Sequence, residues 1–209
     1  GPVGLIGSTK SDALLIVGHM LDDLAAEAGA GAVAGDRDAG SIDRLLAQMD
    51  ARRRGGVLIT VDCGISAIEE VRYPSEQRLQ VIITDHHEPQ AGYLPEAEAV
   101  LNPKQVDCSF PFDQLAGVGV AFFLVMALRK ALAELGLIDG SRINLKKYLD
   151  LVALGTVADV VPLIGINRIL VRAGLEVLSA KQRPGVFALC ERCGIAEREV
   201  LSEDISFKL

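Results

Sequence analysis

Acidic and imidazole side chains follow two short apolar segments of this 209-residue chain. Asp62 comes directly after Val57-Leu58-Ile59-Thr60-Val61, and Asp85-His86-His87 come directly after Val81-Ile82-Ile83-Thr84. Short β-branched runs of this kind are typical of parallel strands buried on both faces. Since ligands collect at the carboxyl ends of parallel strands, these groups should meet at one edge of a sheet. Carboxylates with imidazole suit Mn²⁺ or Mg²⁺ better than thiolate-rich sets do, so we predict a metal site there.

Each of these residues also has an ordinary structural interpretation. An Asp after a strand often caps a turn or a helix, and adjacent histidines can be satisfied by hydrogen bonds at a surface. The combination favours a site, because two of the three histidines share the expected edge with two acids. A further acid, Asp159, follows a helical segment among apolar neighbours that give it no solvating role.

The elements that must position these groups alternate between strand and helix. A helix is expected at 65–71, between the two strands, and a third strand at 99–101. Strand–helix–strand units of this kind build a parallel sheet with helices on its faces. From Gly117 to Gly136 the apolar spacing becomes helical.

The remaining elements are assigned from the same patterns. Towards the C-terminus we expect helices at 145–154 and 166–180, with a loop at 155–162. In the first 55 residues we expect strands at 3–6 and 31–34 and helices at 12–28 and 42–51. The predicted fold class is α/β: a parallel sheet flanked by helices, with a helix-rich C-terminal half.

Composition restricts the other function classes. Half of the residues are hydrophobic, so a packed core is expected; no apolar run approaches the roughly 20 residues that span a bilayer. The net charge of −7 argues against holding nucleic acid by bulk electrostatics, so DNA contacts must be local or metal-mediated. Four cysteines in so long a chain indicate a reducing compartment, and we expect a cytoplasmic protein. Cys190 and Cys193 could bind zinc or do redox chemistry, although two ordinary thiols are the simpler interpretation.

Six stretches, in order and at similar spacing, resemble the DHH family of phosphoesterases and, within it, the RecJ exonucleases. They are LITVDCGI (58–65), ITDHH (83–87), AVLNP (99–103), LAGVGVAF (115–122), LDLVALGTVADVVPL (149–163) and NRIL (167–170). The GTVADVVPL form is more specific than the DHH triplet, because many DHH phosphoesterases lack it. The resemblance implies a metal-dependent nuclease that degrades single-stranded DNA from the 5′ end.

The resemblance also implies roles for individual residues. The metal ligands, for Mn²⁺ or Mg²⁺, would be Asp12, Asp62, Asp85, His86 and Asp159. The catalytic residues would be Asp159 and His87, with His87 beside the scissile phosphate. The implied partners are single-stranded DNA and, as a candidate, single-strand binding protein.

Two further pairs of residues could contact phosphate or DNA. Gly117 and Gly119 stand just ahead of a helix, where backbone N–H groups could approach a phosphate; close helix packing is the alternative. Asn167 and Arg168 match a polar pair near the site in the family. An ordinary helix cap is the alternative for them.

The family's first motif is altered in this chain. It is an Asp-x-Asp-x-Asp-Gly run after the first strand, and the corresponding stretch reads Gly7-Ser8-Thr9-Lys10-Ser11-Asp12-Ala13. Only Asp12 stays in register, so two acids that a pair of metals would share are lost. We therefore expect one Mn²⁺, held weakly. An alternative first motif is Gly35-Asp36-Arg37-Asp38-Ala39-Gly40. It leaves too few residues before the Val57 strand for the strand and helix that usually lie between.

We expect one DHH domain over 1–209. Residues 1–56 would be an atypical N-terminal part and 57–209 a RecJ-like core, truncated where RecJ sequences continue into a further motif and a nucleic-acid-binding domain. Three functions compete: an exonuclease core with impaired activity, a pseudo-enzyme that binds DNA or a replication or repair partner, and a phosphodiesterase for small nucleotides. The GTVADVVPL segment favours the exonuclease core, and the altered first motif favours the pseudo-enzyme. The acidic net charge favours the phosphodiesterase for small nucleotides. The exonuclease core is our prediction.

Overall fold

The computed structural model describes residues 3–7, 32–36, 56–76, 79–91 and 93–209. Within them, five parallel strands form one sheet in the order β2-β1-β3-β4-β5. The strands are β1 (Val3–Gly7), β2 (Ala32–Asp36), β3 (Gly56–Val61), β4 (Leu79–Thr84) and β5 (Ala99–Leu101). The predicted parallel α/β sheet is confirmed. Its central strand, β3, is the run that precedes Asp62.

Six α-helices and two 3₁₀ turns are present in the described residues. The helices are α3 (Ile68–Glu76), α4 (Gly117–Glu134), α5 (Leu149–Ala158), α6 (Gly165–Ser179), α7 (Pro184–Arg192) and α8 (Ser202–Phe207). The 3₁₀ turns are η1 (Gly140–Arg142) and η2 (Leu145–Tyr148). The helix-rich C-terminal half is therefore confirmed. The helices expected at 12–28 and 42–51 lie outside the described residues.

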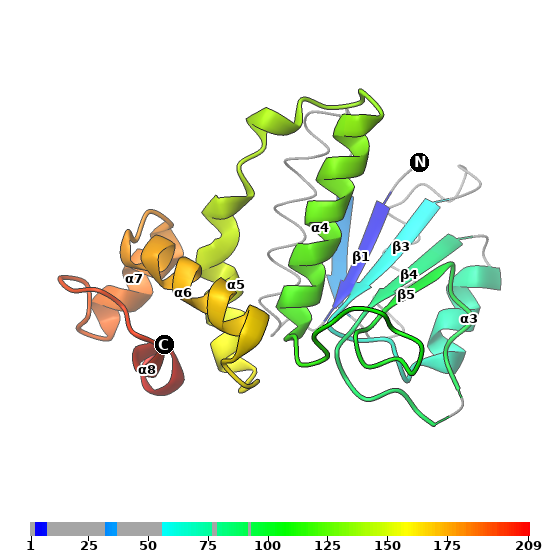
Figure 1. Ribbon diagram of the computed structural model, residues 1–209, viewed down its shortest axis with the longest axis horizontal. Coiled ribbons are helices and arrows are strands. Elements are labelled where there is room, and N and C mark those ends of the chain that lie inside the picture. The colour runs from blue at the N-terminus through cyan, green and yellow to red at the C-terminus, as the bar shows by residue number, and fades with distance from the viewer. Residues whose placement is uncertain (1–2, 8–31, 37–55, 77–78, 92) are drawn as a thin grey trace.

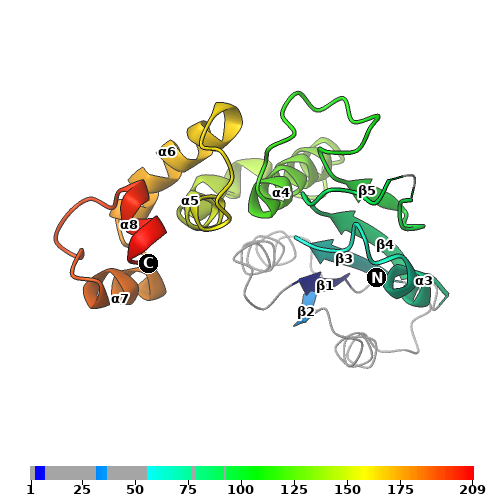
Figure 2. The same cartoon turned by 90° about the horizontal axis from the view of Figure 1, so that it is seen from below.

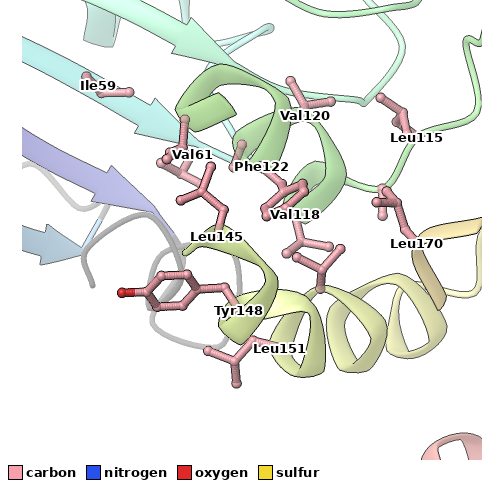
Figure 3. Close-up of a cluster of buried hydrophobic side chains, with 14 of the residues drawn as sticks. Ile59, Val61, Leu115, Val118, Val120, Phe122, Leu145, Tyr148, Leu151 and Leu170 are labelled. Atoms are coloured by element: carbon pink, nitrogen blue, oxygen red, sulfur yellow. The ribbon is translucent and has the colours of Figure 1, made fainter. Parts of the chain in front are cut away.

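Helices cover both faces of the sheet, because each strand alternates its side chains between them. Leu58 and Val81 pack with Val71 of α3 on one face. Ile59 and Val61 pack on the other face with residues of α4, η2 and α5, and Figure 3 shows this second cluster. Figures 1 and 2 show α3 and α4 on opposite sides of the sheet, with α6 to α8 beyond α5. The sheet edge that carries Asp62 and Asp85 thus faces the ends of helices from the C-terminal half.

The end of α5 differs from the prediction. A loop was expected over 155–162, but α5 continues through Ala158, so 155–158 are helical. Tight packing against α6 holds this helix: a Cβ on Gly174 would lie 2.5 Å from the Cβ of Ala153 and 3.0 Å from the carbonyl carbon of Leu149. The extra turn places Asp159 at the C-cap of α5.

Candidate metal centre

A tight turn after β3 presents Asp62 at the edge of the sheet. The Asp62 N–H donates to the carbonyl of Thr84 on β4 (2.9 Å), and the backbone then turns left-handed, with φ at 60°. Asp tolerates this conformation better than most residues. The Thr60 hydroxyl donates to the Cys63 carbonyl (2.7 Å) and closes the turn. The strand end and its turn therefore fix the Asp62 carboxylate at the edge.

The first turn of α4 packs directly on this carboxylate. A Cβ on Gly117 would lie 2.5 Å from Cγ of Asp62 and nearer still to Oδ1. Gly117 is buried, and the N-cap residue, Ala116, supplies no side-chain cap. The helix dipole favours negative charge at this place. These contacts support the interpretation that Gly117 allows close packing. The Asp62 carboxylate occupies the place at the helix N-terminus that the alternative interpretation gave to a phosphate.

The Asp85 carboxylate is buried and bonded to the loops at the ends of β3 and β4. It is 1% exposed, and Oδ2 accepts a hydrogen bond from the Ile65 N–H (2.9 Å). Oδ1 accepts from the N–H groups of His86 (2.8 Å) and His87 (3.2 Å) and lies 2.7 Å from Nδ1 of His87. The structure therefore does not bring Asp85 into the cluster of candidate ligand atoms. It organises the loop and orients His87 instead.

His86 lies between two acids from different parts of the chain. Its Nε2 atom is 3.3 Å from Oδ1 of Asp62, at the end of β3, and 3.4 Å from Oδ2 of Asp159, at the end of α5. This nitrogen is buried and makes no hydrogen bond. Of the five predicted metal ligands, Asp62, His86 and Asp159 are thus brought together.

The neighbouring charges shift the pKa values of this group. Burial lowers the pKa of His86, but the neighbouring carboxylates of Asp62, Asp159 and Asp85 outweigh this effect, so the pKa is raised. Burial raises the pKa of Asp159. The charge of His86 lowers this pKa, but by less than burial raises it. Without a cation, the site therefore tends to hold protons, which is how a cluster of acids reduces its own repulsion.

His87 completes the candidate set. Ligand atoms of Asp62, His86 and His87 lie within 4.8 Å of one another. With Nδ1 of His87 donating to Asp85, the lone pair of Nε2 stays available, an arrangement typical of metal-binding histidines. The His87 side chain is 61% exposed, so it borders the solvent side of the site.

Asn102 is a supporting residue whose role its residue type alone does not indicate. It is 2% exposed; its amide donates to the His87 carbonyl (2.9 Å), and its oxygen accepts from the Lys104 N–H (2.9 Å). Lys104 is near enough for its charge to lower the pKa of Asp159. The available signal was the position of Asn102, a polar residue directly after the third predicted strand.

The donor set fits a divalent cation. A metal–ligand distance of about 2.1 Å places neighbouring ligand atoms about 3 Å apart, and the separations of 3.3 and 3.4 Å around His86 Nε2 are close to this. Carboxylate oxygens with imidazole nitrogens suit Mn²⁺ or Mg²⁺. The buried, unbonded Nε2 atom is the observation that a cation would explain best.

Gly119, Asn167 and Arg168, which were predicted site residues, are not part of this cluster. Asp12 lies outside the described residues. Gly119 is buried, and a Cβ there would meet Leu115 at 3.2 Å, which supports packing. Asn167 is buried on α6 and bonded to two carbonyls, and Arg168 beside it is exposed. Contact of Arg168 with phosphate or DNA stays a prediction.

The cysteines form no cluster with other metal ligands in the described residues. None of the four forms a disulfide, Cys190 is fully buried, and the Cys193 thiol donates to the Lys208 carbonyl (2.8 Å). The only described group that could hold a metal contains no cysteine. These contacts support the interpretation of Cys190 and Cys193 as ordinary thiols.

The fold and the site together define a class: parallel α/β domains that gather acids and histidines at the carboxyl ends of their strands. The model of the DHH family, N-terminal domain, matches residues 13–156, which is more than half of the chain. The chain therefore belongs to the DHH family.

The individual proteins that this chain resembles include RecJ exonucleases of several bacteria. The chain is 49% identical over 164 residues to the single-stranded-DNA-specific exonuclease RecJ of Salmonella typhimurium, and 48% identical over 164 residues to that of Escherichia coli. Each match covers 76% of this chain and 28% of the relative. The RecJ of Thermus thermophilus is 37% identical over 154 residues, 73% of this chain and 21% of the relative. The chain thus spans about a quarter of the length of the relatives it matches.

Solved structures of RecJ proteins are similar to this chain over nearly its whole length. A crystal structure of Thermus thermophilus RecJ with Mn²⁺ has a TM-score of 0.76 and 28% identity, covering 99% of this chain and 28% of that one. A structure of exonuclease RecJ bound to manganese has the same TM-score and 27% identity, covering 99% of this chain and 50% of that one. Among the described residues, none of the helices has the length and apolarity to cross a membrane.

Proposed function

We propose that this chain carries the metal-binding part of an exonuclease that degrades single-stranded DNA from the 5′ end, with Mn²⁺ or Mg²⁺ as its cofactor. The relatives are named as single-stranded-DNA-specific exonucleases, and RecJ structures hold manganese or magnesium. The proposal includes the cytoplasm as location and single-strand binding protein as a partner.

One observation carries the proposal. The buried Nε2 atom of His86 lies within 3.4 Å of carboxylate oxygens from two distant elements, β3 and α5. Two carboxylates held this close to one buried imidazole nitrogen repel each other unless a cation or proton lies between them. We therefore assign Asp62, His86 and Asp159 as ligands, with His87 beside them and Asp85 as the residue that orients His87.

The residues divide the chemistry between them. Bound at this site, a divalent cation supplies Lewis acidity: it activates a water molecule and neutralises charge on the phosphoryl oxygens. Asp62 and Asp159 would provide the negative charge that holds it. Asp85 holds the ring of His87 through Nδ1, which leaves Nε2 available to contact the phosphate.

A pseudo-enzyme that binds DNA without cutting it is the second candidate. The observation that favours it is the altered first motif, with Ser8 and Lys10 where the family has acids. β1 ends at Gly7, which pairs with Val61, so the altered stretch follows the strand next to β3. By contrast, Asp36 ends β2, and β1 separates it from β3. This topology supports the register that places Ser8 and Lys10 in the first motif.

The experiment combines metal binding with cleavage. Mn²⁺ binding is measured by electron paramagnetic resonance, which counts free ions, for the wild-type chain and for His86→Ala. The same proteins are then incubated with 5′-labelled single-stranded oligonucleotide. We expect wild-type binding that His86→Ala abolishes, with little cleavage by either protein, because two-metal cleavage needs the lost acids.

Restoring the motif separates the two candidates. Ser8→Asp with Lys10→Asp, joined to a RecJ-type C-terminal domain, should gain cleavage of single-stranded DNA. Cleavage that appears and is again lost with His86→Ala supports the exonuclease. DNA binding without cleavage in this restored protein supports the pseudo-enzyme, and absence of Mn²⁺ binding in the wild-type chain contradicts the metal site itself.

A further inference from the structure

The amide of Asn167 joins two segments that run to different sides of the candidate metal centre. Asn167 is the third residue of α6, and it is 0% exposed. Its Nδ2 group donates to the carbonyl of Gln114 (2.6 Å) and to the carbonyl of Pro162 (3.0 Å). Both N–H bonds of the amide are used in this way, which also fixes its orientation.

Each of the two carbonyls belongs to a residue that is three positions along the chain from a residue of the site. Gln114 is three residues before Gly117, where α4 begins against the carboxylate of Asp62. Pro162 is three residues after Asp159, at the end of α5. One buried side chain therefore links the segment that supports Asp62 to the segment that carries Asp159.

Direct contact between Asn167 and DNA does not fit this geometry. A phosphate oxygen accepts hydrogen bonds, and both donors of the amide already serve carbonyls. The atom without a partner is Oδ1, which is an acceptor like the phosphate oxygens themselves. The side chain is also fully buried.

We propose that Asn167 is a positioning residue that sets the separation of Asp62 and Asp159 on either side of His86. This role rests on the proposed metal site. Side chains that hold ligands in place typically contribute 10- to 100-fold in metal affinity. Metal–ligand distances should stay within about 0.2 Å of their usual values. Loss of a link between two ligand-bearing segments should therefore weaken metal binding.

The test uses two variants and a matched control. Asn167→Ala removes both donors, and Asn167→Asp keeps the size of the side chain but replaces the donors with acceptors. Ser179→Ala is the control: the Ser179 hydroxyl accepts from the Val200 N–H (2.9 Å), a partly buried link within the C-terminal helices. Mn²⁺ affinity is measured by electron paramagnetic resonance and the melting temperature by circular dichroism.

We expect both Asn167 variants to bind Mn²⁺ about 10- to 100-fold more weakly. Ser179→Ala should lower the melting temperature and leave Mn²⁺ affinity unchanged. Wild-type affinity in the Asn167 variants, with only a lower melting temperature, would overturn the proposal. So would unchanged Mn²⁺ affinity with weaker binding of single-stranded DNA at saturating Mn²⁺, which would indicate a contact with the substrate.

The design separates this proposal from the proposed function. If the wild-type chain binds no Mn²⁺, the metal site fails and not merely the role of Asn167. Should Asn167→Ala and Asn167→Asp not fold, Asn167→Ser retains one donor for one carbonyl. An intermediate Mn²⁺ affinity in that variant is expected, and wild-type affinity would contradict the role.

Discussion

Gly117 offers the sharpest test of the site, because a single methyl group should displace Asp62. In Gly117→Ala the new Cβ would lie 2.5 Å from Cγ of Asp62 and 2.9 Å from its Cβ, whereas such contacts essentially never fall below 3.0 Å. Rotating the side chain moves Cγ but leaves the Cβ contact in place. The backbone at the end of β3, or the start of α4, must therefore move as well.

The size of the effect follows from this displacement. The new Cβ and Cγ of Asp62 have to separate by at least a further 0.5 Å, and the new Cβ and Oδ1 by more. Metal ligands tolerate only about 0.2 Å. We expect Mn²⁺ affinity to fall about 10- to 100-fold, which corresponds to about 1.4–2.8 kcal/mol. Overpacking of this buried contact should also cost about 1–3 kcal/mol of stability.

Gly185→Ala is the matched control. Gly185 is the second residue of α7, and a Cβ there would meet no atom within 4 Å. The same substitution should therefore be neutral or stabilising by up to about 1 kcal/mol, with unchanged Mn²⁺ affinity. Calorimetric titration with Mn²⁺ and thermal denaturation of both variants provide the comparison. Wild-type Mn²⁺ affinity in Gly117→Ala would refute the assignment of Asp62 as a ligand held by α4.

Three further predictions concern metal number, backbone strain and pH. With Ser8 and Lys10 in place of acids, calorimetry should count one weakly bound Mn²⁺ per chain, and a count of two would show that other acids replace them. Val160 is left-handed (φ 57°) and 86% exposed, so Val160→Gly should raise Tm by about 2–4 °C. Gly136→Val, the reverse change after α4, should lower Tm similarly, and unchanged Tm values would contradict this strain argument. Since the pKa of His86 is raised above 6.5, protons should compete with Mn²⁺, and affinity should fall as pH drops through that pKa. Without metal, the same shift stabilises the fold fully below about pH 6.5 and is lost as pH rises through the raised pKa. A Tm difference between wild type and His86→Ala that grows with pH would contradict this sign.

The sheet was predictable because its strands are buried on both faces. The runs at 57–61, 81–84 and 99–101 are short and apolar, and each is a strand in the structure. The strands expected at 3–6 and 31–34 are also confirmed. Since parallel strands end at one edge, the meeting of Asp62 with His86 followed from the sequence alone.

Two boundaries were wrong for physical reasons. The helix expected at 65–71 begins at Ile68, because the Ile65 N–H is bonded to Asp85 and the preceding turn needs Gly64 at φ 110°. Gly155 and Thr156 suggested a loop, since both residues disfavour helices. Packing against α6 outweighs that preference and extends α5 to Ala158. Contacts between distant segments decided both cases.

The division of roles between Asp85 and His87 could not be predicted from residue types. Both residues stand at the same strand end, and either can bind a metal. Asp85 is placed where three N–H groups of its own edge converge, those of Ile65, His86 and His87, and its carboxylate satisfies them. A carboxylate bonded in this way has little capacity left for a cation, whereas the ring that it holds keeps one nitrogen available. The backbone geometry of the loop, which the sequence does not display, therefore decides which of the two residues keeps an atom available to the site.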